Sequence, residues 1–107
     1  MARHRTEAAF AALETELKQE RAATLGRIGS KLEAELARCR TLYAELTEDV
    51  DDDRPATRLA RRERYRQAYA ECEQLRWMLC VQRESMGLMD HSWVNRVFPL
   101  PPAPLTA

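Results

Sequence analysis

A heptad repeat runs through residues 25–50, which read LGRIGSKLEAELARCRTLYAELTEDV. One stripe of this stretch recurs at alternating steps of three and four residues, and all its members except a glycine are apolar. Such spacing places the members on one side of a helix and is typical of a coiled-coil seam. The members are Leu25, Gly29, Leu32, Leu36, Cys39, Tyr43, Leu46 and Val50.

The helix that carries this stripe is predicted to span residues 5–47, which contain no proline and are rich in alanine, leucine, glutamate and arginine. Gly26 and Gly29 each weaken a helix by roughly 1 kcal/mol relative to alanine. The residues from Ser30 to Glu33 also have the form of a capping box, so a break here would give three helices. Because the heptads continue through Gly29, we expect one continuous helix.

A second helix is predicted over residues 55–86, after an acidic tip at 48–54 that ends the first. Pro55 suits a first helical turn, and Gly87 suits the position just past a helix end. Since the connection is short, the two helices are expected to run antiparallel. The second apolar stripe comprises Tyr65, Ala68, Cys72, Leu75, Leu79 and Met86, with Gln82 as its polar member.

The predicted fold class is therefore all-α. Residues 5–86 form an antiparallel coiled-coil helical hairpin, and residues 87–107 form a short helix followed by a proline-rich extended tail. Residues 1–53 carry 8 basic and 12 acidic side chains (net −4), and residues 54–107 carry 9 and 5 (net +4), which favours pairing of the two halves. Counting back from the tip predicts contacts of Leu46 with Arg58, Cys39 with Tyr65, Leu32 with Cys72, and Leu25 with Leu79.

Several apolar side chains exceed what a lone pair of helices can bury. Phe10 and Leu13 lie beyond the predicted end of the second helix, and the C-terminal segment is a candidate to cover them. In residues 75–81, apolar side chains point in every direction around the helix. We therefore expect these residues and the tail to bind a protein partner or a second copy in a four-helix bundle. The expected partner-binding residues are Phe10, Leu13, Leu75, Trp77, Met78, Val81, Trp93, Val97, Phe98, Pro99 and Pro102.

The end of the tail has a more specific pattern, because Arg96 is followed by prolines at the third and sixth positions. This arrangement resembles the ligands of SH3 domains, which bind polyproline II segments. Two other interpretations stay open, namely a tail that lies along a neighbouring protein surface and a solvated chain end.

A row of arginines, Arg58, Arg62 and Arg66, lines one face of the second helix and suggests an alternative function as a small dimeric nucleic-acid-binding regulator. The formal net charge of zero argues against this function, and the arginines have acidic neighbours such as Glu45 and Glu48 in the predicted pairing. Nucleic acid is therefore the less favoured partner.

No motif for catalysis, for a cofactor or for a metal ion occurs in the chain. The cysteines Cys39, Cys72 and Cys80 are odd in number and lack metal-ligand spacing, and the separation of Cys80 from Asp90 and His91 matches no known ligand set. Without a signal-peptide pattern or an apolar run of membrane-spanning length, the expected location is cytoplasmic. We expect a non-catalytic helical adaptor, structural subunit or assembly factor.

Overall fold

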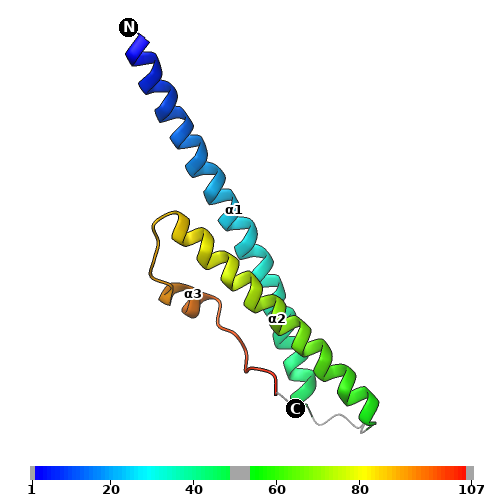
Figure 1. Ribbon diagram of the computed structural model, residues 1–107. Coiled ribbons are helices and arrows are strands. Elements are labelled where there is room, and N and C mark those ends of the chain that lie inside the picture. Colours follow the sequence, from blue (N-terminus) through cyan, green and yellow to red (C-terminus); the bar gives the residue numbers. More distant parts are fainter. Residues whose placement is uncertain (1, 49–53, 106–107) are drawn as a thin grey trace.

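Two long helices pack against each other and run antiparallel (Figure 1). The computed structural model describes residues 2–48 and 54–105, with residues 2–4 described as backbone only. Helix α1 spans Ala2–Thr47, α2 spans Pro55–Ser85 and the short α3 spans Ser92–Val97. No strand occurs in these described ranges, so the helical class is confirmed. The molecule is elongated, with extents of 78 × 21 × 19 Å.

Helix α1 continues through both of its glycines, as the heptad pattern predicts. Apart from its neighbours in the chain and the backbone of its own helix, no atom lies within 4 Å of the position that a Cβ at Gly26 would occupy. At Gly29 the same position lies 3.9 Å from the Phe98 ring, so the C-terminal segment approaches α1 there. The predicted capping box does not interrupt the helix.

The core lies between α1 and α2 and is built mainly from the two predicted stripes. Leu25, Tyr43 and Leu46 lie half-buried at its margin, while Val50 and most of the predicted acidic tip lie outside the described residues. Two core members, Ile28 and Val94, belong to neither stripe. The buried residues are Ile28, Leu32, Leu36, Cys39, Tyr65, Ala68, Cys72, Leu75, Leu79 and Val94.

Cys39 lies near Tyr65, as counting from the tip predicts, but two other contacts across the helix pair differ from the counted ones. Cys39 and Cys72 lie close to each other in the core, whereas counting from the tip places Leu32 at Cys72. The Tyr65 ring lies against Tyr43, with 5.5 Å between ring centroids, one turn beyond the predicted partner. The predicted contacts assume that α2 begins level with the end of α1. In the structure α2 begins beyond the last turn of α1, and Leu59 in its first turns is largely exposed.

A glycine reverses the chain after α2. Gly87 adopts a φ of +82°, and the amides of Gly87 and Leu88 donate to the carbonyls of Glu84 and Arg83. This pattern is the Schellman motif, which favours glycine at the left-handed position. The prediction that Gly87 follows the helix end is confirmed.

The C-terminal segment then folds back along the helix pair, past α3 and toward the end where α2 begins (Figure 1). Val94 of α3 is fully buried, and Phe98 and Leu100 pack against the core. The segment therefore leads away from the first half of α1. The expectation that it covers Phe10 and Leu13 is wrong, because its apolar residues are bound nearer the middle of the helix pair.

Candidate functional site

The first half of α1 projects beyond the end of α2, and we call residues 2–23 the N-terminal extension. Every described side chain of the extension is exposed, including Phe10 (67%), Leu13 (50%) and Leu17 (47%). The spacing of these three residues places them on one side of the helix. Leu17 is absent from the expected partner-binding residues, although its distance of four from Leu13 and seven from Phe10 marks it as part of the same stripe.

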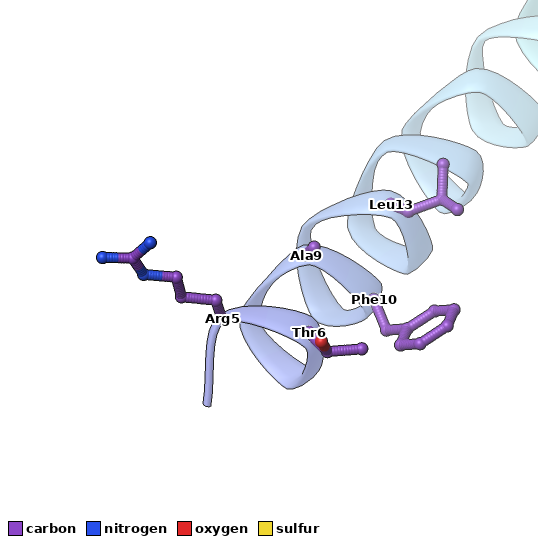
Figure 2. A pocket seen from close by; sticks show the side chains of 5 residues that line it. All are labelled: Arg5, Thr6, Ala9, Phe10 and Leu13. Carbon is purple, nitrogen blue, oxygen red and sulfur yellow. The ribbon is translucent and has the colours of Figure 1, made fainter. Parts of the chain in front are cut away.

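Figure 2 shows this surface at the start of the extension. Phe10 and Leu13 lie on the same side of the helix, and the Arg5 side chain points away from them. A shallow hollow runs past Arg5, Thr6, Ala9, Phe10 and Leu13, all from one helix. Such an open surface suits a packed helix better than a small molecule, which needs an enclosed pocket.

A second exposed apolar group lies on the outer side of α2, and we call Trp77, Met78 and Val81 the outer patch. Trp77 is 63% exposed, while Met78 and Val81 are each more than a third exposed. Leu75, which the sequence groups with them, lies in the core at 2% exposure. Its contacts are therefore within the chain, and it does not contribute to a free surface.

Aromatic and charged side chains hold the C-terminal segment against α2. The Arg83 guanidinium lies 4.8 Å from the centroid of the Trp93 ring, a cation–π distance. Trp93 in turn meets Phe98 edge to face, with 5.9 Å between ring centroids. His91 Nε2 lies 2.7 Å from the Glu84 carboxylate, and Arg76 hydrogen-bonds to the Asn95 side chain.

The end of the segment is held by Tyr65, whose hydroxyl donates a hydrogen bond to the Pro102 carbonyl. Parts of the predicted docking tail remain open to solvent: Trp93 and Val97 are about half exposed, and Pro99 and Pro102 are exposed. Phe98 is half-buried against the core. The residues named from the sequence thus divide into side chains that hold the segment to its own helices and side chains that face outward.

The arginine row is exposed along the first half of α2. Arg58, Arg62 and Arg66 all face solvent. The Arg66 guanidinium lies 2.6 Å from the Glu63 carboxylate on the same helix, so part of its charge is compensated locally. Such exposed pairs contribute only about 0–1 kcal/mol.

The two facing core thiols are poor nucleophiles. Burial raises the pKa of Cys39, and burial together with the adjacent Cys39 raises the pKa of Cys72 to about 12. Since the thiolate is the reactive form, both groups stay protonated near neutral pH. They act as core side chains.

Asp90 and His91 each have a hydrogen-bonding partner other than Cys80. His91 pairs with Glu84, and Asp90 accepts a hydrogen bond from the Ser92 amide, which lowers the pKa of Asp90. Within residues 2–48 and 54–105, no group of three histidine, cysteine, aspartate or glutamate side chains is placed to hold a metal ion.

Comparison of the chain with known protein families, with curated proteins and with solved structures finds no match. None of the helices in the described part of the chain is long and apolar enough to pass through a bilayer.

Proposed function

We propose that this chain is a non-catalytic helical adaptor, structural subunit or assembly factor that acts within a larger protein assembly. In this proposal the helix pair is a coiled-coil hairpin, and burial of its exposed apolar faces against other helices provides the binding energy. A cytoplasmic location is part of the proposal, and the three free cysteines fit a reducing compartment.

One observation carries the proposal: apolar side chains are exposed on two separate surfaces, the N-terminal extension and the outer patch. Scattered single apolar residues are normal on protein surfaces, but grouped ones mark interaction sites. Trp77 is the strongest anchor, because tryptophan contributes a large contact area and is enriched among the residues that dominate binding energy. An enzyme would need an enclosed site, and both surfaces are open.

The outward-facing side chains of the C-terminal segment are a third contact in this proposal. Trp93, Val97 and Pro99 would meet a partner while Val94 and Phe98 keep the segment on its own helices. This proposal corresponds to a tail along a neighbouring protein surface, and in it the partner would lie beside α2.

The proposal is tested by isolating the tagged chain from its native cells and rebinding the purified partner in vitro. We expect Trp77→Asp to weaken rebinding at least tenfold. The matched control is Ala60→Asp, which adds the same charge at an exposed position far from Trp77 on α2. Equal binding by wild type and Trp77→Asp would contradict the role of the outer patch.

The nucleic-acid alternative predicts a different response to salt. If Arg58, Arg62 and Arg66 bind phosphates, affinity for DNA or RNA should fall steeply as salt rises, with a slope set by the number of phosphates bound. Assembly by apolar burial should persist or strengthen in high salt. Titrating one binding reaction at two salt concentrations separates the two functions.

A further inference from the structure

The N-terminal extension is a long helical segment whose side chains from residue 5 to residue 23 are all exposed. At 1.5 Å per residue, residues 2–23 extend for roughly 33 Å beyond the contact with α2. Helices in proteins gain most of their stability from packing an apolar face. The stripe of Phe10, Leu13 and Leu17 is such a face, and all three side chains are exposed.

The position of the stripe makes the extension complementary to itself. Leu13 lies near the middle of residues 2–23, with Phe10 and Leu17 on either side of it. When two such helices are paired antiparallel about Leu13, each Phe10 meets Leu17 of the second copy, and the two Leu13 side chains meet at the centre. In such a two-fold symmetric dimer, the same surface of both copies forms the interface.

The charges beside the stripe favour the same arrangement. With Leu13 at the centre, Arg5 lies beside Glu20 of the second copy, and Glu7 lies beside Arg21 of the second copy. Each pair occurs twice because of the symmetry. Glu14 lies near its own copy across the axis, which is the one unfavourable contact among these charges. The helix dipoles also oppose one another favourably when the helices are antiparallel.

We propose that the N-terminal extension binds the extension of a second copy of this chain, antiparallel and centred on Leu13. This inference rests on the proposed function, since it takes the extension as a working surface, and it names the occupant of that surface. The outer patches remain free for other proteins, so the dimer would present two of them.

Sedimentation equilibrium of the purified full chain tests the proposal. We expect a monomer–dimer equilibrium in the micromolar range, and at least tenfold weaker dimerisation in Leu13→Asp. The control is Ala11→Asp, which adds the same charge at an exposed position on the other side of the same helix. Circular dichroism of each variant checks that α1 remains helical.

Charge reversal tests the orientation. Glu7→Arg should weaken the dimer several-fold, and adding Arg21→Glu in the same chain should restore it. A failure of the double variant to recover would overturn the antiparallel register.

Three further results would overturn the proposal: a wild type that stays monomeric at about 100 μM, equal loss in Leu13→Asp and Ala11→Asp, or a dimer that is lost only in Trp77→Asp. A monomeric wild type whose partner binding still depends on Trp77 would remove this inference alone and leave the proposed function in place.

Discussion

Tyr65 and Pro102 are 37 positions apart in the chain and are joined by a hydrogen bond from the tyrosine hydroxyl to the proline carbonyl. Tyr65 is buried between the helices, with its ring against Tyr43 and Tyr69. One core side chain therefore contributes to the helix contact and also holds the end of the C-terminal segment.

Tyr65→Phe should release the end of this segment while the helix pair stays folded. The ring contacts remain, and the lost hydrogen bond should lower the free energy of unfolding by about 0.5–1.5 kcal/mol. Urea unfolding measures the loss, and NMR relaxation should show faster motion of residues 99–105. Unchanged motion of these residues would mean that the hydrogen bond does not hold the tail.

Stability should fall between about pH 10 and pH 12. Burial, reinforced by nearby cysteines and tyrosines, raises the pKa of Tyr65 to about 12 from the ordinary 10. Over this range the unfolded chain loses the tyrosine proton while the folded chain keeps it, so rising pH favours unfolding. Below pH 10 this contribution to stability is fully present.

Unfolding in urea at several pH values under reducing conditions checks this dependence. Tyr65→Phe should reduce the pH dependence of the free energy of unfolding only in part. The raised pKa of Cys72 also lowers stability as the pH rises from about 9 upward. An identical slope in wild type and Tyr65→Phe would contradict the assignment to Tyr65.

The three cysteines should react with alkylating reagents at different rates. Cys39 and Cys72 are fully buried, and their raised pKa values keep them as thiols, whereas Cys80 is partly exposed. At pH 8 we expect iodoacetamide to modify Cys80 first and the other two only on unfolding. Peptide mass mapping after short reaction times measures the order, and early modification of Cys72 would refute it.

Alanine substitutions at two glycines should have opposite effects. Gly87 has a φ of +82°, so a Cβ there is strained, and Gly87→Ala should destabilise the chain by roughly 1–2 kcal/mol. Gly26 lies inside α1 with open space around it, so Gly26→Ala should stabilise by roughly 0.4–1 kcal/mol. Thermal unfolding of the two variants side by side gives the sign of each effect.

The sequence predicts the helices and most of the core because both depend on local periodicity. The positions of Leu32, Leu36 and Cys39 in α1, and of Cys72 and Leu79 in α2, follow from their spacing alone. The register between the helices does not, because it depends on how the connection turns. A count that assumes a tight tip therefore misplaces the partner of Cys72 and misses the contact of Tyr65 with Tyr43.

The candidate surfaces could be predicted only in part, because some of them depend on contacts between distant parts of the chain. The exposure of Trp77 and Phe10 could be predicted, because a single contact between two helices cannot cover all the apolar residues of this chain. Burial of Leu75 in the core and of Val94 beneath the returning segment depends on contacts between distant parts of the chain. The direction of that segment is set by Gly87 and by pairs such as Arg83 with Trp93, which carry no periodic signal.

The folded-back segment would also weaken the binding of any protein that recognises its prolines as an extended peptide. Pro102 is engaged by Tyr65, and Val94 would have to leave the core before a groove could enclose the whole segment. The apparent affinity of such a competitor falls in proportion to the fraction of molecules in which the segment is released. A ligand that needs the whole segment in extended form would therefore have to bind strongly enough to displace it from the helix pair.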